Sequence, residues 1–166
     1  MYKKRKDEIV MYYLSLIRNK DLTLTKHRWM RFSNEEQVLL MRETVKHPGE
    51  ECEVFGILDA TGSFIPNGFV VLNNIPVSET GRDLFEQRFM NRARLVEKER
   101  GFVAIRVLRP LSHDTYVILT MWESKEAFTR WQESNAYQHA HKKRGTKEGV
   151  DQQSIFPRPS FVETYE

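Results

Sequence analysis

The segment 68–77, GFVVLNNIPV, constrains the fold most, because it is apolar on both of its alternating faces. Such a run is typical of a β-strand that is covered on both sides. We therefore expect this segment to be a central strand of a sheet.

The rest of the C-terminal part continues with regular patterns. Helical spacing of apolar residues predicts a helix over 80–100, and β-rich runs predict strands at 102–108 and 115–122. A second helix capped by Ser124 and a last strand at 160–165 follow. Together with the first strand this is the ferredoxin-like order of an α+β fold. It produces one antiparallel sheet with both helices on a single face, so the other face is left bare.

A bare apolar sheet face has to be covered, and small domains of this type commonly place two sheets face to face as a dimer. The turn-forming run TGSFIPN ends a strand-rich first part, so we divide the chain into 1–66 and 67–166. The first part contains short β-favouring runs at 9–17, 29–32, 38–41 and 54–58. We expect this half to act as the missing partner, which predicts a monomer built as a pseudo-dimer. The alternative is a homodimer.

Composition narrows the class of function. The net charge of +3 comes from 26 basic and 23 acidic residues that are interleaved, so we expect no nucleic-acid partner. The single cysteine, Cys52, rules out an internal disulfide and fits a reducing compartment, which predicts a cytoplasmic protein. The apolar run 9–17 is too short to span a bilayer and has no cleavage site like that of a signal peptide, so we expect no membrane partner.

Three residues differ from their surroundings: Asn73 in the apolar strand, Trp131 near a helix end, and His141 in a short polar helix that Ser134 or Asn135 begins. Each has an ordinary explanation. The Asn73 amide can bond to backbone at a strand end, and Trp131 can be a core aromatic. His141 can be a metal or haem ligand, but a lone histidine in a basic run is more often an exposed surface residue. These residues alone justify only a soluble α+β domain.

The arrangement of whole segments changes this balance. The runs FVVLNN, ERGFVAIRVLRP, YVILTMWESKEAF and WQESNAYQHAHKKRG resemble the antibiotic-biosynthesis-monooxygenase superfamily of dimeric α/β-barrels, and within it the IsdG-type haem-degrading monooxygenases. The resemblance covers 68–165. It implies that Asn73 is the distal residue at the haem, that Trp131 presses on its ring, and that His141 is the proximal iron ligand. The family's spacing of ten residues between Trp131 and His141 is retained.

The resemblance also implies a chemistry. Haem would be cofactor and substrate together, and its ring would be opened with O₂ and electrons from an external donor, a reductase or a small reductant, to release iron. Apolar residues of the 80–100 helix, with Phe89 foremost, would line the pocket. The N-terminal extension most resembles that of the HmoB-like branch of bacilli, whose members are described as monomeric.

Three alternatives stay open. A haem carrier or sensor would use His141 without turnover. A cofactor-independent monooxygenase of the same superfamily would act on an aromatic or quinone-like compound. The two-part architecture also resembles the staphylococcal signal transduction protein TRAP, which lacks the asparagine, tryptophan and histidine set.

Overall fold

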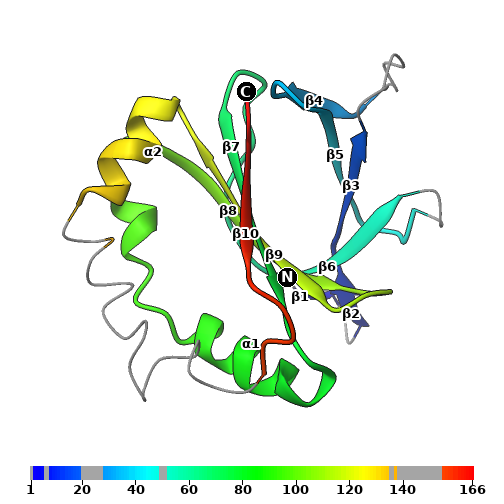
Figure 1. The fold of residues 1–166 in the computed structure, drawn as a ribbon. Coiled ribbons are helices and arrows are strands. Elements are labelled where there is room, and N and C mark those ends of the chain that lie inside the picture. The colour runs from blue at the N-terminus through cyan, green and yellow to red at the C-terminus, as the bar shows by residue number, and fades with distance from the viewer. Residues whose placement is uncertain (1, 6–7, 20–27, 49–51, 135–136, 138–154) are drawn as a thin grey trace.

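The structure of the 166-residue chain is a computed structural model, which describes all residues except 1, 6–7, 20–27, 49–51, 135–136 and 138–154 (Figure 1). In the described part, the first half forms the strands β1 (Tyr2–Arg5), β2 (Glu8–Met11), β3 (Tyr13–Asn19), β4 (Met30–Ser33), β5 (Val38–Thr44) and β6 (Glu53–Gly62). The second half forms β7 (Phe69–Pro76), α1 (Arg82–Met90), β8 (Phe102–Pro110), β9 (Thr115–Trp122), α2 (Lys125–Gln132) and β10 (Phe161–Tyr165). Two short 3-10 helices, Glu79–Gly81 and Leu95–Lys98, flank α1.

Eight of these strands form one antiparallel sheet that curls into a barrel. Their order is β10-β7-β9-β8-β6-β3-β5-β4, while β1 and β2 pair separately. The two outer strands meet, because Ser33 and Glu166 each donate a backbone N–H to the carbonyl of the other at 2.9 Å. In Figure 1 the C-terminus accordingly lies beside β4. The barrel is thus nearly closed within a single chain.

The N-terminal half covers the sheet face that the helices leave bare. β6 pairs with β8 and joins the two halves into one sheet. The barrel interior is one apolar core drawn from both halves, with buried Leu14, Leu16, Phe32, Leu39, Met41, Phe55, Ile57, Val70, Leu72, Ala104, Leu108, Val117, Leu119, Met121 and Tyr165. The expected ferredoxin-like α+β half with a strand-rich partner half is confirmed, with one difference. The cover is a continuation of the same sheet rather than a second sheet packed against it.

Both helices pack on the outside of the C-terminal half of the sheet (Figure 1). Alternation along β7 decides which residues meet which layer. Val70 and Leu72 point into the barrel core, whereas Val71 and Ile75 pack in clusters with the helices. Asn73 shares the helix-facing side with these last two residues.

The helix expected over 80–100 is shorter than predicted, and the prediction was wrong in this respect. α1 has nine residues, after which Arg94 adopts a left-handed backbone with φ 58° and a short 3-10 helix follows. The reason lies far away in the chain. Arg92 and Arg94 form ion pairs with Asp59 of β6 at 2.7 and 3.0 Å, and these pairs draw the segment down onto the sheet.

Two smaller outcomes concern the N-terminal half. The run 9–17, whose β-favouring pattern was ambiguous, is divided between β2 and β3. The boundary proposed between residues 66 and 67 falls in the turn that precedes β7. The halves on either side of this turn share one sheet and one core, so they are described as a single unit.

A polar network fills one end of the barrel and links strands from both halves. Arg18 of β3 donates hydrogen bonds to Glu53 of β6 at 2.7 Å and to Glu163 of β10 at 2.6 Å. Its guanidinium also donates to the side-chain oxygen of Asn74 at 2.8 Å. Gln37 donates to the second oxygen of Glu163 at 2.9 Å. One cation therefore neutralises two partly buried carboxylates.

Replacing Arg18 by Met is expected to lower the free energy of unfolding by about 3 kcal/mol, because Glu163 loses its paired guanidinium and Glu53 keeps only the His113 ring at 3.4 Å. Urea unfolding measures the change. Arg158→Met is the matched control, since Arg158 pairs with Asp114 at 2.7 Å on the exposed surface and its loss should leave stability nearly unchanged. Equal losses in the two variants would show that the network does not hold the barrel together.

Candidate functional site

The helix-facing side of the C-terminal sheet carries a row of residues that crosses the strands. Strand register places Val162 of β10 beside Asn73 of β7, and Asn73 beside Ile118 of β9. The row continues through Val107 of β8 to Asp59 of β6. Strands lie about 4.8 Å apart, so the row extends over roughly 19 Å. We call this row, from Val162 to Asp59, the candidate strip. It is apolar except for Asn73 and for the charged Asp59 at its β6 end.

Two apolar clusters join the helices to this side of the sheet. The Trp131 cluster lies under α2 and consists of Phe69, Val71, Trp122 and Ala127 with the partly buried Val96, Phe102, Phe128 and Trp131. The Phe89 cluster lies under α1 and consists of Ile75, Val77, Phe85, Ile105, Val107, Tyr116 and Ile118 with the partly buried Leu58, Phe89, Val96, Phe102, Ile155 and Phe156. Because Val71 belongs to the first cluster and Ile75 to the second, Asn73 lies between them.

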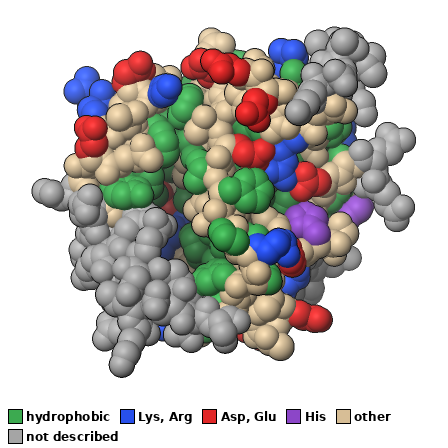
Figure 2. Space-filling view, in the orientation of Figure 1, with side chains coloured by type: hydrophobic (Ala, Val, Ile, Leu, Met, Phe, Trp, Pro, Cys, Tyr) green, Lys and Arg blue, Asp and Glu red, His purple; other side chains and the backbone are tan. Residues whose placement is uncertain are grey.

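The side chain of Asn73 is half-buried, and its amide has no hydrogen-bond partner among the residues that the structure describes. Its neighbour Val162 is 59% exposed and Ile118 is 8% exposed, whereas Leu72 and Leu119, on the barrel side of the same two inner strands, are 0% exposed. In Figure 2, hydrophobic side chains reach the surface between α2 and β10. The strip is therefore partly exposed at Asn73, where the amide has no partner in the described part of the chain.

Trp131 lies near the end of α2, and local sequence fixes this helix against the sheet. The Ser124 hydroxyl accepts a hydrogen bond from the Ala127 N–H at 3.2 Å, which is the predicted N-cap. Gly101 has a positive φ of 85°, and a Cβ there would stand 2.5 Å from the Cβ of Ala127. The Trp131 indole stacks on the buried Trp122 with ring centroids 5.3 Å apart.

Phe89 lies on α1, under which the second cluster forms. Its ring packs on the buried Phe85 at a centroid distance of 4.8 Å, and Phe85 packs on Tyr116 of β9 at 4.7 Å. Glu86 accepts hydrogen bonds from the Tyr116 hydroxyl and the Arg109 guanidinium. Burial alone would raise the pKa of Glu86, but the bonds from Arg109 and Tyr116 outweigh it and hold this pKa below its ordinary value.

The segment between α1 and β8 is clamped onto the sheet by charges. Arg92 pairs with Asp59 at 2.7 Å and with Glu97 at 2.9 Å, and Arg94 pairs with the same two carboxylates at 3.0 and 3.1 Å. Burial would raise the pKa of Asp59, but Arg92 and Arg94 together hold it below its ordinary value. Val96, within this segment, packs in both apolar clusters. These ion pairs thus hold the segment between α1 and β8 against the end of the candidate strip formed by Asp59.

His141 lies outside the described residues, so its role stays a prediction. The nearest described residue before it is Tyr137, whose N–H donates to the Ser134 hydroxyl at 3.2 Å. The Ser134 hydroxyl thus accepts from the N–H three residues later, which is the bond that an N-cap serine makes. The Tyr137 ring packs edge-on against Trp131 with centroids 4.9 Å apart.

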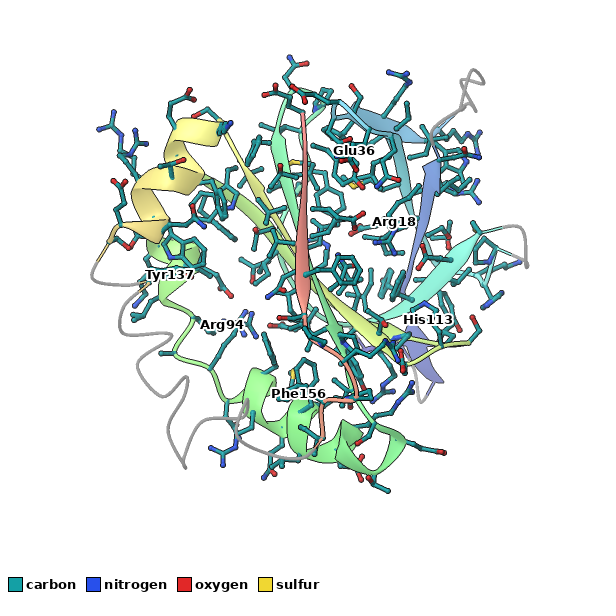
Figure 3. All side chains as sticks on the ribbon, in the orientation of Figure 1. Arg18, Glu36, Arg94, His113, Tyr137 and Phe156 are labelled. Carbon is teal, nitrogen blue, oxygen red and sulfur yellow. The ribbon has the colours of Figure 1, made fainter. Side chains whose placement is uncertain are left out.

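On the other side of 138–154, Ile155 and Phe156 pack in the Phe89 cluster. Figure 3 shows Tyr137 next to α2 and Phe156 next to α1, on the helix-facing side of the sheet. Arg18, by contrast, lies on the barrel side. The two ends of the described chain around 138–154 therefore border the candidate strip from its two helices.

Sequence reasoning did not assign a role to Asn74, which is fully buried inside the barrel. Its amide donates to Glu163, and its side-chain oxygen accepts from Arg18. These partners are 89 and 56 residues away in the chain, so no local spacing indicates them. Strand alternation does indicate that Asn73 and Asn74 face opposite layers.

Two further observations concern metals and membranes. In the described ranges, no group of three or more His, Cys, Asp or Glu side chains is placed to hold a metal ion. Within the same part of the chain, no helix has the length and apolar character needed to cross a membrane.

Comparisons with known proteins identify this half of the chain. The family model described as antibiotic biosynthesis monooxygenase matches residues 68–143. A staphylobilin-producing haem oxygenase of Staphylococcus aureus is 35% identical over 78 residues, which are 45% of this chain and 71% of that protein. The chain belongs to this monooxygenase family. The predicted relationship to IsdG-type members is confirmed by these matches.

A second relative within the monooxygenase family is a mycobilin-producing haem oxygenase of Mycobacterium tuberculosis. It is 40% identical over 63 residues, which are 37% of this chain. The match spans 60% of the length of that relative.

Solved structures extend the likeness to nearly the whole chain. A protein described as a major regulator of staphylococcal pathogenesis has a TM-score of 0.77 and 18% identity, over 93% of this chain and 98% of that one. A haem-degrading enzyme from Listeria monocytogenes has a TM-score of 0.63 and 16% identity, over 92% of this chain and 97% of that one. At these identities the likeness shows the fold alone. The monooxygenase domain with a strand-rich first half is thus a fold that recurs in other proteins.

The lowered pKa of Glu86 predicts how α1 responds to acid. A carboxylate with a depressed folded-state pKa stabilises the fold above its unfolded pKa of about 4.3, and this contribution is lost as pH falls through the folded value. Glu86→Gln should therefore cost about 2 kcal/mol at pH 7 and progressively less below about pH 4. Urea unfolding across this pH range measures the difference.

Glu35→Gln is the control for this experiment, because Glu35 is exposed in the turn before β5. Its stability should follow that of the wild type at every pH. A Glu86→Gln difference that stays constant as the pH is lowered would show that the carboxylate charge does not fasten α1.

Proposed function

We propose that this chain is a haem-degrading monooxygenase, which binds haem against the strip around Asn73 and opens its ring with O₂ and electrons from an external donor to release iron. The observation that carries the proposal is the Asn73 amide, which is half-buried and unpartnered among described residues, between the two apolar clusters. Ligand sites of this kind are mostly apolar with a few directed polar groups. The haem-degrading relatives support haem as the substrate.

The residues around the strip fit a flat apolar ring. Val162 and Ile118 offer aliphatic contact from the sheet, on either side of Asn73. Trp131 and Phe89 border the strip from α2 and α1. Flat aromatic contact from two sides with one amide in the middle is suited to holding a macrocycle while leaving a polar group at its face.

His141 is proposed to bind the iron through a neutral imidazole nitrogen. It follows Tyr137 by four residues, and four residues of chain span at most about 14 Å. Tyr137 packs against Trp131, so the chain that leads to His141 starts at the α2 border of the strip. This reach supports the assignment of His141 as proximal ligand.

When bound, haem supplies the iron at which O₂ is reduced and the ring that is opened. The Asn73 NH₂ group would supply a hydrogen-bond donor at the strip, where it could orient O₂. The Trp131 indole, backed by the buried Trp122, would hold the macrocycle by flat aromatic contact from the α2 side. Phe89 keeps water from the α1 side. No protein nucleophile or general base is needed for these roles.

We also propose that the chain acts as a monomer in the cytoplasm, with a reductase or a small reductant as the electron donor. The closure of the barrel supports the monomer. The outer strands β4 and β10 are joined within one chain by the backbone hydrogen bonds between Ser33 and Glu166, so the ends of these edges are not open to a second chain. The single cysteine, Cys52, supports a reducing compartment.

The first test adds one equivalent of haemin to the purified protein, then a reductant in air with catalase present. We expect a Soret band on binding, its loss after reduction, and stoichiometric release of ferrous iron. Light scattering of the same sample should give the mass of one chain. A stable haem spectrum would indicate a carrier or sensor, and no binding at all would point to a regulator without haem.

His141→Ala and His139→Ala form the matched pair for the iron ligand, since the two histidines lie in the same run HAH. The first variant should lose the Soret band of the bound form, and the second should keep it. An unchanged spectrum in His141→Ala would remove this residue from the site.

Asn73→Leu tests the amide itself. The variant should bind haemin with a Soret band close to that of the wild type, because its side chain keeps a similar size and the apolar strip is intact. Loss of the band after reduction should slow about a hundredfold, as when one preorganised hydrogen-bond donor is removed from an active site. Single-turnover kinetics measure this rate.

Asn74→Leu is the control, since Asn74 lies on the opposite face of the same strand. It should lower the free energy of unfolding and leave the turnover rate of the folded protein unchanged. If Asn73→Leu degrades haem at the wild-type rate, the amide has no part in the reaction.

A further inference from the structure

A buried hydrogen bond stands directly behind the candidate tryptophan. Trp122, at the end of β9, is 0% exposed, and its Nε1–H donates to the hydroxyl oxygen of Thr120 at 3.1 Å. An indole N–H can only donate, so a buried one requires an acceptor. Thr120 is the residue that supplies it here.

This bond fixes the Trp122 indole in its plane. Phe102 meets the ring edge-on, with centroids 5.9 Å apart and planes at 87°, and Phe128 packs on it at 5.8 Å. Aromatic packing alone leaves the two faces of an indole nearly equivalent, whereas a bond at Nε1 distinguishes them. Thr120 therefore selects one orientation of the ring.

The orientation is passed on to Trp131. The two indoles are stacked with centroids 5.3 Å apart and an interplanar angle of 29°. Trp131 is itself only half-buried, and Trp122 is the broad flat surface on which it rests. Trp131 also packs on Phe128 and Tyr137, and Trp122 is the fully buried ring of the three, so a change in the plane of Trp122 alters the surface on which Trp131 stacks.

Thr120 also belongs to the row next to that of Asn73. Strand register places it beside Val71 of β7, two residues before Asn73 on the same side of the strand. Thr120 is 8% exposed, so its hydroxyl is buried on this side of the sheet. The acceptor thus lies in the row of the sheet next to that of Asn73.

We propose that Thr120 is a positioning residue, which holds the Trp131 indole at its angle through Trp122 and thereby sets how far bound haem is bent. The inference rests on the proposed function for its second half. Its first half, the link from Thr120 to the tryptophan pair, concerns the chain alone. The alternative is that the hydroxyl only satisfies a buried donor and stabilises the strand.

The test compares Thr120→Val with Thr120→Ser in the full chain. Valine keeps the shape and removes the acceptor, whereas serine keeps the acceptor. Stacked indoles produce a couplet in far-ultraviolet circular dichroism, and Trp131→Phe identifies it by abolishing it. Without haem, Thr120→Val should weaken or invert this couplet and Thr120→Ser should retain it. An unchanged couplet in Thr120→Val would overturn the inference.

Haem-loaded protein tests the second half. Thr120→Val should shift the Soret band and the out-of-plane porphyrin modes in resonance Raman spectra. It should also slow haem degradation about tenfold, as is usual when a partner that orients a functional group is removed. Thr120→Ser should restore both. A weakened couplet with wild-type spectra and rate would overturn the role in bending haem.

Two further outcomes are distinguishable. If the wild-type chain binds no haem, the proposed function fails and with it the bending role, while the couplet still decides the link from Thr120 to Trp131. If Thr120→Val alone does not fold, Thr120→Val combined with Trp122→Phe leaves no buried donor unpaired. The comparison is with Trp122→Phe alone, in which Thr120 is intact. If Thr120 acts through Trp122, the two variants should have the same haem spectra and the same rate of haem degradation. A further change in the double variant would show that the hydroxyl acts elsewhere, which would overturn the inference.

Discussion

The need to cover one apolar sheet face governs this molecule. A ferredoxin-like half places α1 and α2 on one side of its sheet and leaves the other side without a layer. The chain meets this need by continuing the same sheet through β6 and bending it until β4 reaches β10. The inside of the barrel then becomes the structural core, and the helix-facing side is released for a site. Each later feature depends on this separation of roles between the two faces.

The neighbouring residues Asn73 and Asn74 show the separation at its sharpest. They have the same side chain and successive positions on β7, yet alternation sends one to each face. Asn74 is fully buried and its amide is saturated by Arg18 and Glu163 inside the barrel. Asn73 is half-buried and keeps its amide free of described partners. An amide that is saturated by the protein stabilises a fold, and one that is not is available to a ligand.

Local periodicity was sufficient to predict the strands and the order of elements in the C-terminal half, because each signal lies within its own segment. It failed where distant residues decide the backbone, as at Arg94, whose contact with Asp59 pulls the chain out of the helix. The pairing of Arg18 with Glu163 spans 145 residues and has no local signature. In the candidate site, alternation predicted that Asn73 lies on the helix side, and the Ser124 cap predicted the helix that carries Trp131. That Asn73 and Trp131 lie beside the same strip follows from the order of the strands in the sheet, and no single segment of sequence encodes this order.

The seam between Ser33 and Glu166 has a consequence for how the protein responds to dilution. When a sheet face is covered by a second chain, the folded population obeys mass action and falls as the protein becomes scarce. Here the covering strands are tethered to the face they cover, so they are present at an effective concentration set by chain geometry rather than by expression level. The architecture of the barrel is therefore maintained at any abundance of the protein, including the lowest.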